Sequence, residues 1–164
     1  MAIGVFWRLI PHIPNMTPLV GLSLFAGAYL NRGPAFSIIL AVLFISDLGL
    51  ALIFGYPVVG YYTFFTYTGF LGVILLGSGV LDGSKWRFPA YILGSSFGFW
   101  IWTNFGVWLT APFYTKNLDG LIACYNMAIP FLRNAIFGDL IWSCLIFGIF
   151  YILLNRKRAE SICY

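Results

Sequence analysis

Long apolar stretches alternate with short polar or proline-containing segments along the whole chain. A helix needs about 20 mostly apolar residues to cross a bilayer, and the stretches that begin at Pro34, Val58, Pro89 and Leu121 are of that order or longer. Two earlier stretches are shorter. The pattern therefore predicts six helices, of which the first is short. The expected bounds are 1–10, 17–30, 34–54, 58–81, 89–110 and 121–155.

The breaks between these stretches carry residues that end helices. Pro11–Pro14 contains two prolines, each of which lacks an N–H and clashes with the preceding turn, so we expect a rigid loop. Gly55–Pro57 predicts a tight turn, and residues 82–87 form a polar loop. Residues 121–130 are expected to be a short helix or half-helix that is kinked at Pro130 into the last span.

The composition is typical of a membrane protein. The 164 residues are 61% hydrophobic and 9% charged, with a mean hydropathy of +0.91, whereas soluble domains carry about 25% charged residues. The predicted fold class is an all-α integral membrane bundle of six helices, with one transmembrane domain over residues 1–164 and the lipid bilayer as a partner. The net charge of +4 comes from basic residues between apolar runs, so we expect no nucleic-acid partner.

The basic residues also predict the orientation, because cytoplasmic loops of membrane proteins are enriched in Lys and Arg. If the C-terminus is cytoplasmic and the spans alternate, the outer loops hold only Lys116. An even number of spans then places the N-terminus in the cytoplasm too, provided that the short first helix crosses. The basic residues of the inner segments are Arg32, Lys85, Arg87, Arg156, Lys157 and Arg158.

Residues for metal, nucleotide or hydrolytic chemistry are scarce. The chain has one histidine, His12, and three scattered cysteines, with no glycine-rich phosphate loop and no pattern of a catalytic triad. We therefore expect no enzyme activity, no cofactor and no metal site. Cys124 is either a reactive thiol or a small buried hydrophobic residue, and the sequence leaves its role open.

Two carboxylates, Asp47 and Asp139, lie deep in predicted spans. A buried charge is costly in a bilayer, so each is expected to be paired, protonated or turned toward a watery cavity. Asp47 belongs either to a ligand or proton site or to a structural pair, with Arg133, Arg8 or Asn104 as the expected partner. Arg133 and Asp139 are six residues apart, which is about 240° around a helix, so they do not share a face.

Trp100, Asn104 and Trp108 are spaced four residues apart and form one stripe on the fifth predicted helix. Two indole rings with an amide between them can hold a flat ring by stacking and hydrogen bonds. The structural alternative places Trp108 in an aromatic belt at the membrane surface and Trp100 between helices. Arg133 either extends to the outer headgroups or binds an anionic or carbonyl group of a ligand.

Four segments carry a resemblance to known proteins: RLIPHIPNMTPLVGLSLFAGAYL, FISDLGL, TNFGVWL and GLIACYNMAIPFLRNAIFGDL. In this order they resemble an uncharacterised family of small bacterial multi-pass membrane proteins, which is similar to the substrate-binding S components of energy-coupling factor transporters. The resemblance implies a location in the bacterial cytoplasmic membrane and a ligand site that faces outward. It also implies a coupling membrane subunit with ATPases as partners. The first helix lacks the Ala-xxx-Ala face that S components usually offer to that subunit.

By this resemblance the site would involve the first external loop and the last three helices. Together with the tryptophan stripe, the expected substrate-binding residues are His12, Asn15, Trp100, Asn104, Trp108, Asn126 and Arg133.

The leading hypothesis is a subunit that binds a vitamin-like small molecule for uptake. One alternative is a membrane scaffold whose polar groups only lock helices together, and another is a small ion-coupled transporter that uses Asp47 and Asp139. A cavity of about 300 Å³ or more, lined by Asn104 and Arg133, would favour binding. A solid core would favour the scaffold, and polar openings on both sides would favour the ion-coupled transporter.

Overall fold

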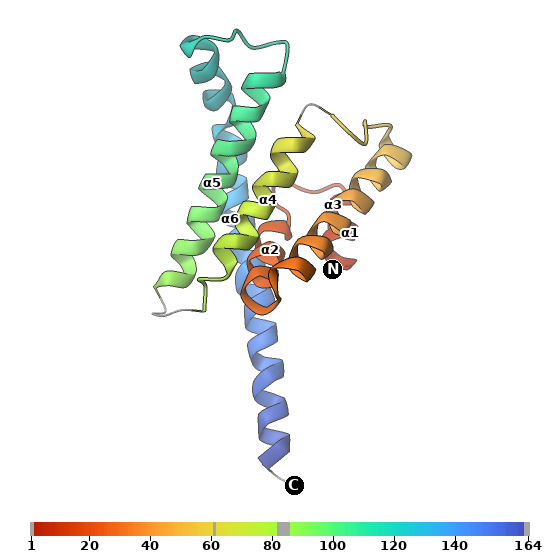
Figure 1. Ribbon diagram of the computed structural model, residues 1–164, viewed down its shortest axis with the longest axis vertical. Helices are drawn as coiled ribbons and strands as arrows, with labels where there is room; N and C mark the ends of the chain where they lie inside the picture. The colour runs from red at the N-terminus through yellow and green to blue at the C-terminus, as the bar shows by residue number, and fades with distance from the viewer. Residues whose placement is uncertain (1, 61, 82–85, 163–164) are drawn as a thin grey trace.

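The computed structural model describes residues 2–60, 62–81 and 86–162, the last seven of these for the backbone alone. Six α-helices and no strand form within this part of the chain (Figure 1). They are α1 (Ala2–Leu9), α2 (Leu19–Tyr29), α3 (Arg32–Phe54), α4 (Thr63–Gly77), α5 (Arg87–Thr110) and α6 (Leu118–Ile162). The expectation of an all-helical fold with a short first helix is confirmed.

Helix α2 is the central element, because it packs against α3, α4, α5 and α6. Its sequence is apolar on every side, as a helix that is enclosed all round requires. The approach to α4 is so close that a Cβ added at Gly27 would lie 2.0 Å from the carbonyl oxygen of Ile74. A Cβ at Gly77 would likewise lie 2.4 Å from that of Leu24. Two glycines facing each other let these backbones touch.

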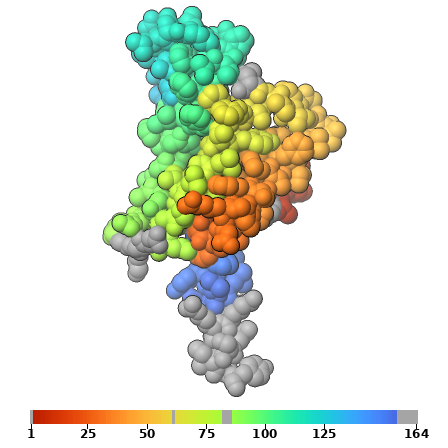
Figure 2. Space-filling model, in the orientation of Figure 1, coloured from red at the N-terminus to blue at the C-terminus, as the bar shows by residue number. Residues whose placement is uncertain are grey.

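Helices α5 and α6 run side by side in opposite directions, and α1 packs on α3. The C-terminal part of α6 continues beyond the ends of the other helices (Figures 1 and 2). Apolar side chains on this extension, among them Ile149 and Leu153, are exposed. This helix is therefore much longer than the bundle that it helps to form.

Two helices are long and apolar enough to cross a membrane: α3, with a mean hydropathy of 2.5, and Leu118–Asn155 of α6, with 2.1. Helices α2 and α4 are apolar but have only 11 and 15 residues. Helix α1 has 8 residues and is therefore about 12 Å long, well short of the roughly 30 Å of a bilayer core.

The bounds of two predicted helices, the fourth and the sixth, differ most from those in the structure. Helix α4 begins at Thr63 rather than at Val58, because the backbone N–H of Gly60 donates to the Thr63 hydroxyl (2.8 Å) and closes a turn before the helix. The expected half-helix over 121–130 is wrong, since α6 is one helix of 45 residues that passes through Pro130. The proline removes one backbone hydrogen bond, but the packing of α6 along α5 keeps the helix continuous.

The loop of residues 10–18 joins α1 to α2 and is held in place by Trp7. The indole Nε1 donates to the carbonyl oxygen of Met16 (2.9 Å), and the ring packs edge-on against Trp142 with 4.7 Å between centroids. Asn15 adopts a left-handed conformation with φ 63°, which Asn tolerates better than most residues. In Figure 1 this loop lies between the two ends of α3 rather than beyond either end.

Candidate functional site

A partly enclosed cavity of about 270 Å³ lies between the loop of residues 10–18, α2, α4, α5 and α6. Its α6 wall consists of Phe131, Ala135 and Asp139, which are four residues apart and share one helical face. The α5 wall follows the same periodicity, with Ser96, Phe99, Trp100, Thr103, Asn104 and Val107. The remaining lining residues are Arg8, Asn15, Thr17, Leu19, Val20, Thr66 and Phe70.

Four residues singled out from the sequence meet in this cavity: Asn15, Trp100, Asn104 and Asp139. They come from three separate parts of the chain, so the fold brings them together. The cavity is slightly smaller than the volume of about 300 Å³ that we expected for a binding site. It is lined by Asn104, as expected, but not by Arg133.

Arg133 lies on a different side of α6. It is exposed and borders a separate, more open groove of about 550 Å³, together with Met16 and Pro130. The geometric argument that Arg133 and Asp139 occupy different faces is thus confirmed, with Asp139 turned inward and Arg133 outward.

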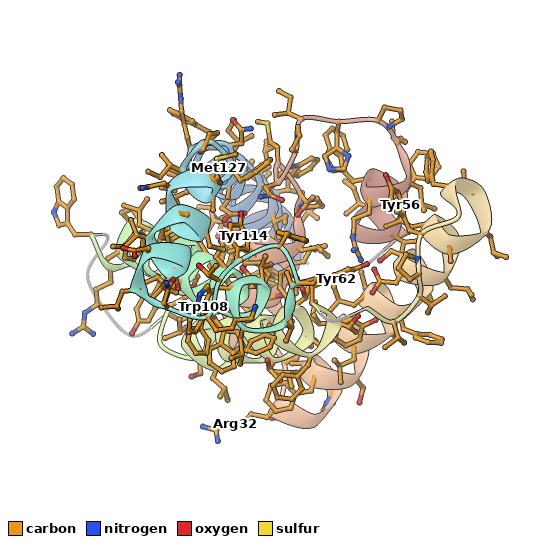
Figure 3. The ribbon with its side chains drawn as sticks, turned by 90° about the horizontal axis from the view of Figure 1, so that it is seen from above. Arg32, Tyr56, Tyr62, Trp108, Tyr114 and Met127 are labelled. Carbon is orange, nitrogen blue, oxygen red and sulfur yellow. The ribbon has the colours of Figure 1, made fainter. Side chains whose placement is uncertain are left out.

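Three other expected site residues do not line the cavity. Trp108 lies in the last turn of α5, and its Nε1 donates to the carbonyl oxygen of Thr115 in the α5–α6 connection (3.0 Å). Figure 3 shows Trp108 and Tyr114 at this end of the molecule, seen from above. Asn126 is exposed on α6. His12 lies beside Trp7, and its Nδ1 is 2.7 Å from the carbonyl oxygen of Ile10.

Side chains tie α5 to α6 along the wall that carries Trp100 and Asn104. The Trp100 Nε1 donates to the carbonyl oxygen of Ala128 (3.0 Å), and the Tyr125 hydroxyl donates to that of Ile101 (2.8 Å). The Asn104 Nδ2 donates to the carbonyl oxygen of Trp100 (2.8 Å). Within the described part of the chain the amide oxygen of Asn104 accepts no hydrogen bond, so it is available to a ligand in the cavity.

Cys124 is a buried residue of this α5–α6 contact, with 2% of its surface exposed. Its thiol lies 3.5 Å from the carbonyl oxygen of Asn104, to which it donates a weak hydrogen bond. Burial raises the pKa of the nearby Tyr114 phenol above its ordinary value of 10.0, and the Cys124 thiol beside it acts in the same direction. These contacts fit a packed thiol rather than an activated one.

Asp47 is paired, and the partner is Arg8, one of the three candidates that the sequence left open beside Arg133 and Asn104. The Arg8 Nη2 lies 2.7 Å from the Asp47 Oδ1, and the two side chains are 18% and 14% exposed. The Tyr67 hydroxyl donates to the other carboxylate oxygen (2.9 Å), and Arg8 also donates to the hydroxyl of Ser46. This network joins α1, α3 and α4 at the edge of the cavity, which Arg8 lines and Asp47 does not.

Asp139 has a different environment. Only 3% of its surface is exposed, and the Ser96 hydroxyl lies 2.6 Å from its Oδ2. The same hydroxyl is 3.0 Å from the carbonyl oxygen of Ile92, and its single proton cannot serve both acceptors fully. No basic side chain pairs with Asp139 among the residues that the structure describes.

Sequence reasoning missed Arg8, Ser96 and Thr103 as cavity residues. A signal was present for the last two, because Ser96, Thr103 and Asn104 recur at helical spacing on one side of an otherwise apolar helix. No sequence signal places Arg8 at the cavity, since only the turn at residues 10–18 brings α1 there. Among described side chains, no three of His, Cys, Asp or Glu gather where they could share a metal ion.

A family of unknown function, DUF6580, matches the chain over residues 1–161. The chain belongs to this family. All the cavity residues lie inside the matched region, so the cavity is made entirely from the part of the chain that the DUF6580 family shares. The expectation of an uncharacterised family is thereby confirmed. No curated protein and no solved structure matches the chain.

Proposed function

We propose that this protein is a membrane-embedded subunit that binds a small organic molecule from the outer side of the membrane and delivers it to an uptake transporter. The observation that carries this proposal is the cavity of about 270 Å³. Its walls combine the aromatic rings of Phe99 and Trp100 with polar groups such as Asn15 and Asn104. Apolar walls with a few convergent polar groups are typical of small-molecule sites.

The positions of the helix ends support the proposed membrane orientation. In Figure 1, α3 and α5 begin and α6 ends toward the same end of the molecule, whereas the α5–α6 connection lies at the other. Arg32 and Arg87 open α3 and α5, and Lys116 lies in the α5–α6 connection. We therefore assign the first end to the cytoplasm. Lys85 lies outside the described residues.

Helices α1 and α2 each cross only part of the bilayer in this arrangement. With 8 and 11 residues they are about 12 and 16 Å long, and the loop between them lies between the ends of α3 (Figure 1). Non-helical backbone is tolerated at membrane depth where it lines a cavity, as Asn15 and Thr17 do. The two short helices form a hairpin that keeps the N-terminus on the cytoplasmic side.

The partners in this proposal come from the resemblance to S components. They are a coupling membrane subunit and its ATPases in the bacterial cytoplasmic membrane. A scaffold would need no cavity among its polar groups. The ion-coupled alternative relied on Asp47 and Asp139, but Arg8 holds Asp47 outside the cavity lining. Binding of an organic molecule, without enzyme activity, is therefore the function that the site favours.

The test is to purify the protein gently and identify a co-purifying small molecule by mass spectrometry. Binding of that molecule should weaken about fivefold in Asn104→Ala, because one hydrogen bond is worth roughly 1 kcal/mol. Arg133→Ala is the matched control, since Arg133 lies outside the cavity and its loss should leave affinity unchanged. A protein that carries no ligand, or equal affinities for wild type and Asn104→Ala, would contradict the proposal.

A further inference from the structure

The charge balance of the cavity narrows the class of ligand. Among the residues that the structure describes, two ionisable side chains line it, Arg8 and Asp139. The charge of Arg8 is already compensated by Asp47, whose carboxylate lies 2.7 Å away and outside the lining. Asp139 has no such compensation among the described residues, so the cavity itself carries an uncompensated acid.

The place of Asp139 is also short of hydrogen-bond donors. A carboxylate can accept about four hydrogen bonds. Within the described part of the chain, the one side-chain donor that contacts Asp139 is the Ser96 hydroxyl. That hydroxyl shares its proton with the carbonyl oxygen of Ile92. With 3% of its surface exposed, Asp139 receives little help from bulk water. A buried acid in this condition needs a donor from whatever fills the cavity.

The order of the lining residues along α5 and α6 shows which side chains lie near a ligand group that donates to Asp139. Along α5, Ser96 comes first among these lining residues, and Phe99, Trp100 and Asn104 follow toward the C-terminal end of the helix. On α6, Phe131 stands two turns before Asp139. The acid is therefore at one end of the cavity and the aromatic walls extend from it toward the α5–α6 connection.

From this geometry we propose that the ligand carries a protonated nitrogen, attached to a flat ring, which binds the Asp139 carboxylate. This inference rests on the proposed function and adds the substrate class: an organic cation rather than an anion. The ring lies between Phe99, Trp100 and Phe131, where a cation and an aromatic face also attract each other. The volume of about 270 Å³ has room for about nine water-sized groups, so a compact ring system fits.

Three probes of nearly equal shape can test the charge preference: benzamidinium, benzamide and benzoate, which are cationic, neutral and anionic at neutral pH. Binding to wild-type protein in uncharged detergent is measured by ligand-observed NMR titration. Benzamidinium should bind at least about fivefold more tightly than either of the others, because a charge-assisted pair is about twice as strong as a neutral hydrogen bond and the difference is the worth of one such bond.

The variant Asp139→Asn keeps the shape and removes the charge. It should lose at least about fivefold in benzamidinium affinity and keep its affinity for benzamide. Asp119→Asn, on an exposed acid at the start of α6, should change neither affinity. The order of the three probe affinities is measured on wild-type protein. It therefore tests the inference even if Asp139→Asn fails to fold.

The outcomes separate the two proposals. If benzamide or benzoate binds as tightly as benzamidinium and Asn104→Ala weakens that binding, the cavity binds small molecules and only the organic-cation inference fails. If none of the three probes binds to wild type and no ligand co-purifies, the proposed function fails and this inference fails with it.

Discussion

Removing Arg8 alone should destabilise the protein more than removing Arg8 and Asp47 together. In the variant Arg8→Met, the Asp47 carboxylate loses its basic partner and keeps the hydrogen bond from Tyr67 (2.9 Å) while it remains largely buried. Breaking one side of a buried ion pair costs about 3 kcal/mol or more. The double variant Arg8→Met/Asp47→Leu leaves no unpaired charge, and we expect a loss of about 1–2 kcal/mol from changed packing.

The magnitude follows from the geometry of the pair. Asp47→Leu alone leaves the guanidinium with the Ser46 hydroxyl and a long contact to the carbonyl oxygen of Leu43 (3.5 Å), so we expect a loss of about 2–3 kcal/mol. The two single losses then sum to about 5–6 kcal/mol, and the double variant should recover at least about 3 kcal/mol of that sum.

The assay is reversible unfolding in mixed micelles, followed by circular dichroism while a denaturing detergent is added. Arg32→Met is the control, because Arg32 is an exposed charge at the start of α3 and should change the free energy of unfolding by less than about 0.5 kcal/mol. If the losses of the two single variants simply add in the double variant, within about 0.5 kcal/mol, the ion pair does not stabilise the contact between α1 and α3 and the reasoning is refuted.

Two further predictions concern helix packing and topology. Gly27→Val should prevent folding or lower the melting temperature strongly, because its Cβ would lie 2.0 Å from the carbonyl oxygen of Ile74. Gly98→Ala should be tolerated, because a Cβ added there would meet open space. Equal melting temperatures of the two variants would contradict the packing of α2 on α4. A cysteine placed at Asn117 should be labelled by a charged maleimide from outside intact cells. A cysteine placed at Gly83 should be labelled only after the membrane is opened. Labelling at position 83 in intact cells would reverse the proposed orientation.

The structure changes what the aromatic stripe on α5 means. Sequence spacing grouped Trp100, Asn104 and Trp108, and the fold separates them, since the first two line the cavity and Trp108 fastens the α5–α6 connection. Periodicity tells which side chains share a helical face, but not how far along that face a cavity extends. The length of a site along a helix depends on the neighbours that close it, here the loop of residues 10–18.

Hydrophobic patterning alone determined much of this protein, because long apolar runs and prolines locate helices through local physics. It predicted six helices with a short first one, and the cost of a buried charge led to a polar partner for Asp47, with Arg8 among three candidates. The spacing of Arg133 and Asp139, about 240° around a helix, was by itself enough to place them on different faces.

Only the tertiary structure decided which polar residues meet. Arg8 reaches Asp47 and the cavity because the turn at residues 10–18 folds α1 back beside α3, and no local pattern encodes that path. Asp139 meets Ser96 across 43 positions of sequence through the packing of α6 on α5. Contacts of this kind depend on how whole helices pack. The sequence therefore specifies which face of a helix carries a polar side chain, and the three-dimensional fold specifies which residue it contacts.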